Sequence, residues 1–395
     1  MRKLVVALVV VFLSLNLFAE STISIIDKIL KKTVLQYSQL AKTAVKYPNK
    51  LPKTFQQDSV VMADAAWWTS GFFPGTLWYI YEASKDKNIK VLAEQFSARA
   101  EGQKYTTDNH DVGFMIYCPF GNALRLSPKN EYKAVIIQAA KSLSTRFNPT
   151  VGQIKSWDDK PQWSYPVIID NMMNLELLCA ATELSGDSSF YKIAIKHADG
   201  TMKNHFRPDM SCYHVVSYDT ATGQVNAKQT WQGLNDGSEW SRGQSWAIYG
   251  YSMMYRMTKE KRYLEQAVKI ADYLINHPQM PKDMIPYWDF DDPKIPNALR
   301  DASAGAVICS ALIELSQFVP AAKSKKYLGV AEKQIRALCS PAYLADKNEI
   351  GGFILKHGVG FLPHNSEVDV PLTYGDYYFV EALLRYKKLK TRSSK

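Results

Sequence analysis

Two kinds of apolar pattern alternate along this chain. The first kind is amphipathic, with a tyrosine followed by apolar residues at helical spacing and polar residues between them. Four copies start at Glu131, Phe190, Arg262 and Lys326, and a weaker copy starts at Asn88. The tyrosines of the four copies are 59, 72 and 64 residues apart. These stretches, with a further one at about 25–45, predict helices that cover a core with one face.

The second kind of pattern is apolar on every side, which is typical of a buried helix. Its six copies start at Gly71, Asp111, Asp170, Arg242, Asp301 and Thr373. Pairing each buried helix with an amphipathic one predicts an all-α fold, an (α/α)6 toroid or six-hairpin barrel. The alternative is an open solenoid of about six hairpins. A polar–apolar alternation over residues 211–233, with turn residues at 220–223, predicts a small β-hairpin inserted before the fourth buried helix.

In a toroid all six inner helices run the same way, so their N-termini meet at one end of the barrel. These N-termini carry Asp111, Asp170, Arg242, Asp301 and Asp376, and most tryptophans lie in the loops before them. The partial positive charge of helix N-termini favours anionic ligands. The sequence therefore predicts a polar, aromatic funnel at this end, which would be a ligand site.

The N-terminal residues and the net charge predict where the protein acts and what kind of substrate it binds. Residues 1–19 have a basic start, an apolar stretch and a small residue at Ala19, which predicts a secretory signal peptide. Residues 20–395 would then be a single catalytic domain, secreted or periplasmic and not held in a membrane. The net charge of +10 becomes +8 without Arg2 and Lys3, and a positive field helps to capture anionic substrates. Because the charges are scattered, they do not indicate nucleic-acid binding.

The aromatic and cysteine residues do not point to one function. Nine tryptophans and 23 tyrosines suit sugar binding, but they also suit core packing. The five cysteines are odd in number and form no CxxC motif, so we expect no disulfide framework.

Asp170 is the leading candidate for chemistry. It stands between apolar residues in "PVIIDNMMNLELL" (166–178), where a carboxyl group is either a helix N-cap or a proton donor. Met173 rules out a capping box, and Asn174 would extend a short polar stripe one turn further. Apolar neighbours would raise the pKa of Asp170 and keep it protonated near neutrality, as a general acid requires.

Asp111 would lie at the same end of the barrel, with Asp108 and His110 beside it. This cluster could cap the helix, bind a metal, or pair with Asp170 as an acid and a base. No HExxH-like spacing supports a metal, so we expect no metal and no cofactor.

Other polar residues could bind substrate. His214 and Gln232 flank the predicted hairpin and could face the funnel, although a lone histidine is often structural. Arg242 and Trp246 are one helical turn apart. An arginine at a helix N-terminus opposes the helix dipole, which favours a role in binding a carboxylate, with Trp246 stacking on a sugar. The alternative is a surface salt bridge beside a core tryptophan.

The most specific stretches are "HDVGF" (110–114), "IIDNMMNLELL" (168–178), "WSRGQSWAIYG" (240–250) and "EVDVPLTYGDYYFVEALLR" (367–385). With them the chain resembles the unsaturated glucuronyl hydrolases, glycoside hydrolase family 88, over nearly all of its length after residue 19. The resemblance implies hydration of the C4=C5 double bond of an unsaturated uronic acid at the non-reducing end of lyase-generated oligosaccharides. Asp170 matches the acid/base and Asp111 the second aspartate. The positions that match substrate-contacting residues are His110, Trp157, His214, Gln232, Arg242 and Trp246.

The resemblance leaves several points open. Phe361 and Leu362 stand in the stretch 357–369 where members often have a basic or polar residue, and His364 and Ser366 are the remaining candidates there. The basic charge favours a glycosaminoglycan-derived substrate over a pectin-derived one, which an unsaturated rhamnogalacturonyl hydrolase would take. A non-catalytic glycan-binding protein would not need both aspartates, and a lyase on the same toroid typically uses a tyrosine–histidine pair. The oligomeric state cannot be read from the sequence.

Overall fold

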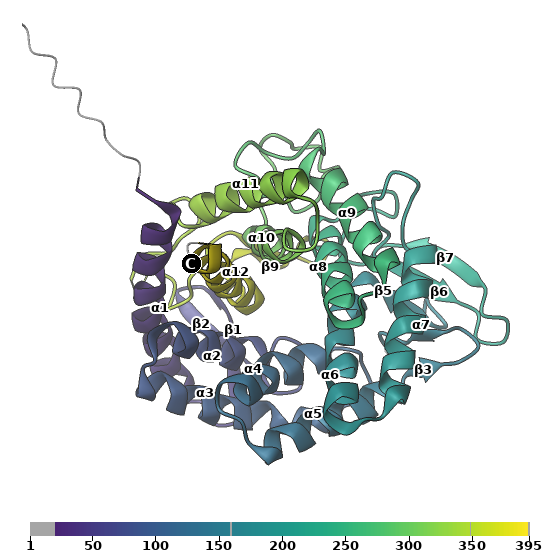
Figure 1. Ribbon diagram of the computed structural model, residues 1–395, viewed down its shortest axis with the longest axis horizontal. Coiled ribbons are helices and arrows are strands. Elements are labelled where there is room, and N and C mark those ends of the chain that lie inside the picture. The colour runs from purple at the N-terminus through teal and green to yellow at the C-terminus, as the bar shows by residue number, and fades with distance from the viewer. Residues whose placement is uncertain (1–19, 159, 348, 394–395) are drawn as a thin grey trace, which may run out of the picture.

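The computed structural model describes residues 20–158, 160–347 and 349–393. The predicted signal peptide, residues 1–19, lies outside the described residues. Within the described part, twelve α-helices form two concentric rings (Figure 1). The outer ring consists of α1 (Thr22–Ala44), α3 (Lys87–Ala100), α5 (Asn130–Ser144), α7 (Ser188–Asn204), α9 (Lys261–Ile275) and α11 (Ala321–Leu338). The inner ring consists of α2 (Phe72–Ser84), α4 (Cys118–Leu126), α6 (Leu175–Ser185), α8 (Ser241–Thr258), α10 (Ala302–Leu315) and α12 (Thr373–Ser393).

The inner ring is closed, because α12 packs against both α10 and α2. This contact joins the last inner helix to the first, so the predicted toroid is confirmed and the open solenoid is wrong. The predicted difference between the rings also holds. Every residue of α10 is buried, whereas α9 buries one face, from Tyr263 through Ala267 and Ile270 to Leu274.

Two of the repeated tyrosines contribute a repeated contact. Tyr263 of α9 donates its hydroxyl to Asp199 Oδ1 of α7 at 2.9 Å, and Tyr327 of α11 donates to Asp272 Oδ1 of α9 at 3.1 Å. Both rings are buried, so their hydroxyl groups need partners there. The tyrosine at the start of these outer helices therefore links its helix to the preceding outer helix.

Short β-strands lie in the connections between the helices. The predicted hairpin is confirmed as β6 (Val215–Tyr218) and β7 (Val225–Gln229), which β5 (Pro166–Ile168) extends to a three-stranded sheet. Three hairpins were not predicted, because their strands are short or bulged. They are β1 (Lys50–Gln56) with β2 (Ser59–Asp64), β3 (Phe147–Asn148) with β4 (Gln153–Ile154), and β8 (Gly358–Phe361) with β9 (Ser366–Val370).

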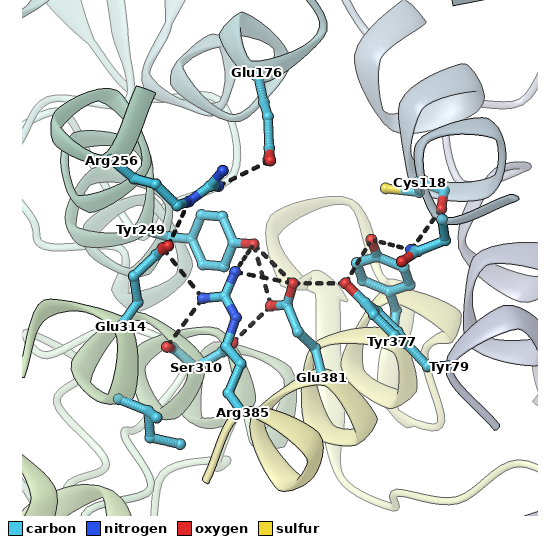
Figure 2. A network of polar contacts seen from close by, with 12 residues as sticks. Tyr79, Cys118, Glu176, Tyr249, Arg256, Ser310, Glu314, Tyr377, Glu381 and Arg385 are labelled. Carbon is cyan, nitrogen blue, oxygen red and sulfur yellow. Dashed lines mark hydrogen bonds and ion pairs between the residues drawn. The ribbon is translucent and has the colours of Figure 1, made fainter. Parts of the chain in front are cut away.

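Side chains of the inner helices form a polar network around Glu381 (Figure 2). Glu381 Oε1 accepts from the Tyr79 hydroxyl at 2.7 Å, and Oε2 accepts from Ser310 at 2.6 Å. Arg385 lies 3.1 Å from Glu381 and 3.2 Å from Glu314. A cavity of about 790 Å³ beside the network is lined by Tyr79, Glu314, Glu381 and Arg385, together with Glu176 and Arg256. The pattern predicted inner helices that are apolar on every side. The network shows that they also carry buried polar groups.

Within the described residues, none of the helices combines the length and the apolar character that crossing a membrane would require.

Candidate active site

The second and third inner helices begin irregularly, and this brings Asp111 and Asp170 together. A π-helical turn, Gly113–Tyr117, precedes α4, and a 3₁₀ segment, Ile169–Asn174, precedes α6. The two segments touch: a Cβ on Gly113 would lie 2.5 Å from Asn174 Oδ1, so only glycine fits. Asn174 Oδ1 accepts from the Phe114 backbone N–H at 2.9 Å. Asn174 therefore joins two inner helices, which the predicted polar stripe did not anticipate.

Asp170 is not a helix cap. It lies inside the 3₁₀ segment, whose N-cap is Ile168, and no side chain caps that terminus. Its Oδ2 atom is buried and has no hydrogen-bond partner among the described residues. Burial raises the pKa of Asp170 to about 7, although the nearby charge of Arg242 lowers it. Asp170 therefore holds a proton over much of the neutral range, which agrees with the predicted proton donor and not with a cap.

The pKa of Asp111 is also raised. Burial and the negative charge of Asp170 raise the pKa of the Asp111 carboxyl to about 8. A charged Asp170 makes Asp111 harder to ionise, so neutral solution leaves at least one proton on the two groups. This is the electrostatic arrangement of an acid/base pair.

The other aspartates at this end of the barrel are structural. Asp301 caps α10 through Ser303 N at 3.0 Å and pairs with Arg242 Nη1 at 2.9 Å. Asp376 accepts from the Tyr37 hydroxyl at 3.0 Å and from the backbone N–H of Leu355 at 2.8 Å. These carboxylates thus differ from Asp170 because their oxygens have hydrogen-bond partners.

His214 presents a fixed tautomer to Asp170. Its Nδ1 atom accepts from the backbone N–H groups of Trp231 and Gln232, both at 3.1 Å. Burial lowers the pKa of His214 well below its usual value, so the ring is neutral. The single ring proton must then be on Nε2, which lies 3.6 Å from Asp170 Oδ2. This distance is longer than a hydrogen bond, but catalytic contacts often tighten only when substrate binds.

His110 repeats this arrangement next to Asp111. Its Nδ1 lies 3.2 Å from Ser156 Oγ, which also accepts from the Ile168 backbone N–H. When the Ser156 hydroxyl donates its proton to Nδ1, the ring proton is on Nε2, 3.4 Å from Asp111 Oδ1. Burial again lowers the pKa of the histidine well below its usual value. Each carboxyl group thus has a neutral histidine N–H beside it.

A matched pair of substitutions tests the role of His214. In His214→Asn the amide oxygen can replace Nδ1 and hold the 231–232 backbone, but nothing reaches Asp170. In His214→Gln the longer side chain can reach Asp170 but loses the backbone contact. We expect His214→Asn to lower kcat/KM by about ten- to a hundredfold with little change in melting temperature. His214→Gln should keep more activity and lose more stability, and the reverse ranking would show that the ring only supports the hairpin.

Arg242 is buried and bound to protein groups. Besides Asp301, its guanidinium donates to the backbone carbonyls of Val359 and Gly360 in β8, the latter at 2.5 Å. Of the guanidinium nitrogens, Nε alone finds no partner in the part of the chain that the structure describes. The alternative of a surface salt bridge is wrong, since the pair with Asp301 is buried. The predicted contact with a substrate carboxylate is untested, and any such contact would use Nε or a rearranged guanidinium.

Trp246 is fully buried. Its ring packs 5.5 Å from Phe114 and 5.6 Å from Tyr378, measured between ring centroids. Because the ring has no exposed surface, stacking on a sugar would require these aromatics to move, and the predicted role of Trp246 in substrate binding stays a prediction. Its indole Nε1 has no partner with good geometry, so this residue could still contribute a donor.

Gln232 and Trp157 lie nearer the mouth of the site. Gln232 Nε2 donates to the Gly360 carbonyl at 3.2 Å, which ties the β7 loop to β8. Trp157 is half-buried, with its ring 5.9 Å from His214, edge to face. It is thus placed where a ring bound beside Asp170 could contact it.

Sequence reasoning missed several groups at this end of the barrel. Tyr374, Thr373 and Glu367 each have a buried polar atom without a partner. All three lie within the 367–385 stretch. Ser156 was also missed, although it stands next to Trp157. Buried polar groups without partners are rare, and their concentration here marks the polar end of the barrel as a ligand site.

The toroid with a buried acid pair at one end defines a carbohydrate-active enzyme of the helical-barrel type, and comparison with known proteins agrees. The family model described as Glycosyl Hydrolase Family 88 matches residues 35–388. The chain is 46% identical to an unsaturated glucuronyl hydrolase of Formosa agariphila, over 98% of this chain and 99% of the other. It is 32% identical to an unsaturated chondroitin disaccharide hydrolase of Streptococcus pneumoniae, over 92% and 91% of the two chains.

A solved structure is similarly close. The crystal structure of an unsaturated glucuronyl hydrolase specific for heparin superimposes with a TM-score of 0.90 at 46% identity, covering 93% of this chain and 98% of the other. The chain therefore belongs to glycoside hydrolase family 88 and is a glycosidase.

Proposed function

We propose that this protein removes the unsaturated uronic acid from the non-reducing end of oligosaccharides left by polysaccharide lyases, and that it does so by hydrating the C4=C5 double bond. The observation that carries this proposal is the state of Asp170: a buried carboxyl with a free oxygen and a pKa of about 7. Such a group can give a proton to carbon at neutral pH.

The chemistry assigns one task to each group. Protonated Asp170 adds its proton to C4, and positive charge develops at C5 and the ring oxygen. The resulting carboxylate accepts a proton from the water that attacks C5. The hemiketal formed at C5 then opens and releases the neighbouring sugar. Asp111 and the N–H groups of His110 and His214 would hold the uronate and the water in place.

The substrate would be derived from a glycosaminoglycan. The relatives named above are described as acting on unsaturated glucuronyl groups, on chondroitin disaccharide, or on heparin. The net positive charge of this chain also favours an anionic oligosaccharide. Asp170, Asp111, His110 and His214 would form the site for the unsaturated uronate, and Trp157 would contact it from the mouth.

We also propose that the enzyme acts outside the cytoplasm, in the periplasm or the medium. This rests on the sequence of residues 1–19 alone. Cell fractionation, with mass spectrometry of the mature N-terminus, tests it: a mature protein starting near residue 20 is expected, and an intact start in the cytoplasm would contradict it.

A screen of unsaturated disaccharides tests the proposed function. The conjugated C4=C5 bond absorbs in the ultraviolet, so hydration is seen as loss of absorbance. We expect loss with unsaturated disaccharides from chondroitin, hyaluronan or heparin, and a much slower loss with those from pectin. Absence of any loss with all of them, by a folded protein, would overturn the proposal.

The pH dependence should follow the carboxyl pair. The active form holds the proton on Asp170, so kcat/KM should be nearly constant below the pKa and fall as pH rises through about 7 to 8. Initial rates between pH 5 and pH 9 check this. An activity that rises over this range would mean that the carboxylate, and not the acid, starts the reaction.

A further inference from the structure

The cavity beside the Glu381 network has no role in the proposed function. Its volume of about 790 Å³ suits a small organic ligand. Phe114 lines one side of it, whereas Asp111 and Asp170 are not part of the lining. On that side the buried ring of Phe114 packs 5.5 Å from the buried ring of Trp246. The cavity is therefore distinct from the site of the catalytic pair.

The ion pairs of this cavity leave one negative charge in excess. Arg256 pairs with Glu176 and Glu314 (Figure 2). Arg385 pairs with Glu314 and Glu381. Three carboxylates thus face two guanidinium groups, which favours a cationic ligand. Among the described residues, no three His, Cys, Asp or Glu side chains are grouped to hold a metal ion, so the cation would be organic.

The other cations of the lining do not cancel this excess. Arg125 pairs with Glu82 at 2.6 Å. Lys387 pairs with Asp27, also at 2.6 Å. Lys388 is exposed, so water and salt screen its charge. A cation that enters the cavity therefore meets a net negative interior.

Two polar groups in the cavity are left for a ligand. Glu176 Oε1 accepts from Arg256 Nη2 at 2.8 Å, and none of the described residues binds the other oxygen, Oε2. Tyr378 is 3% exposed and lines the cavity, and its hydroxyl has no hydrogen-bond partner in the described part of the chain. Burial raises the pKa of this hydroxyl, and Glu176 is among the negative charges that raise it further. An ammonium group, with three N–H donors, can bind both oxygens.

Tyr117 adds an aromatic face beside Glu176. A Cβ on Gly121 would lie 3.0 Å from Tyr117 Cε2, so glycine leaves the ring room to lie against α4. Burial raises the pKa of Tyr117, and the negative charges of Glu176 and Glu183 raise it as well. Aromatic faces attract ammonium groups, which agrees with a cationic ligand at this place.

A second carboxylate lies two turns further along the same helix. Glu176 and Glu183 are seven residues apart on α6 and share a face, and Ala180 between them also lines the cavity. Glu183 is exposed and makes no ion pair with any described residue. Seven residues rise about 10 Å, which an extended chain of about seven carbons between two nitrogens spans. This face therefore offers a carboxylate at each end and an apolar floor between them.

From this geometry we infer that the cavity binds a linear aliphatic diamine. One ammonium group lies between Glu176, Tyr378 and Tyr117. The other lies at Glu183, and the carbon chain crosses Ala180. The inference goes beyond the proposed function and does not depend on it, because the ligand binds outside the catalytic pair and its binding is measured without turnover.

Calorimetric titration with diamines of increasing chain length tests the spacing. At constant ionic strength the affinity should rise with length and be highest near about seven carbons. Heptane-1,7-diamine should bind about fivefold more tightly than heptylamine, which lacks the second ammonium group. An affinity that depends neither on chain length nor on the second amino group would overturn the inference.

Two variants assign the two ends of the ligand. Glu176→Gln keeps an acceptor for Arg256 but removes the charge, so it should weaken both the diamine and the monoamine about tenfold. Glu183→Gln should weaken the diamine about three- to fivefold and leave the monoamine unchanged. Glu131 is exposed on α5 and lies outside the lining, so Glu131→Gln removes one negative charge elsewhere and should change neither affinity.

The outcomes are separable. Because Glu183 is exposed, Glu183→Gln tests the inference even if Glu176→Gln unfolds. If Glu183→Gln binds the diamine like the wild type, or if Glu131→Gln loses as much affinity, the inference is overturned. Asp170→Asn saturated with an unsaturated disaccharide should bind the diamine as tightly as without it. Competition between the two would place the amine at the catalytic end and would also overturn the inference.

Discussion

Asp170→Asn is expected to abolish the loss of ultraviolet absorbance, with kcat/KM reduced at least about a thousandfold. Asparagine keeps the shape of the side chain but cannot give a proton to C4. The result should be the same at every pH, because the variant has no titrating group at this position. An activity within about tenfold of wild type would move the role of the acid to another residue, and Asp111 would be the first to examine.

The same variant should fold at least as well as the wild type, which separates chemistry from stability. Burial raises the pKa of Asp170 from 3.8 to about 7, so the folded state holds a proton that the unfolded state loses near pH 4. Between those values the native protein binds more protons than the unfolded chain, and its stability therefore falls as pH rises. Asparagine removes this cost. Urea unfolding at pH 8 should show an unfolding free energy no lower than that of the wild type.

Glu381→Ala is expected to cause a large loss of stability, about 3–5 kcal/mol. The glutamate accepts from Tyr79, Tyr249 and Ser310 and pairs with Arg385, all on inner helices (Figure 2). Its removal would leave three buried hydroxyl groups without this acceptor and a partly buried arginine with one carboxylate fewer.

Chemical denaturation measures this loss, and a nearby residue provides the control. Glu183 lies on α6 and also lines the cavity, but its side chain is exposed. Glu183→Ala should change the unfolding free energy by less than about 0.5 kcal/mol. If Glu381→Ala costs no more than this control, the network does not hold the barrel together.

The fold could be predicted because the two helix types bury their side chains in different ways. Inner helices such as α10 are buried on all sides, and outer helices such as α9 on one side, so composition and period separate them. The closure of the ring did not follow from the pattern itself. It depends on α12 meeting α2, a contact between the two ends of the chain.

The site could be predicted only in part. That Asp170 and Asp111 share one end of the barrel followed from the common direction of the inner helices. The tautomers of His110 and His214 could not be predicted in this way, because they depend on Ser156 and on the backbone N–H groups of Trp231 and Gln232. The burial of Trp246 and the three partners of Arg242 were also invisible, since both depend on residues more than 50 positions away.

The most direct test of the account is to run the reaction in deuterated water and examine carbon C4 of the product by NMR at partial conversion. If protonated Asp170 starts the reaction, the product should carry one deuterium on a single face of C4, formed in step with the loss of absorbance and the release of the neighbouring sugar. Release of that sugar while the C4=C5 bond and its absorbance persist would mean attack at the anomeric carbon, and would contradict the account.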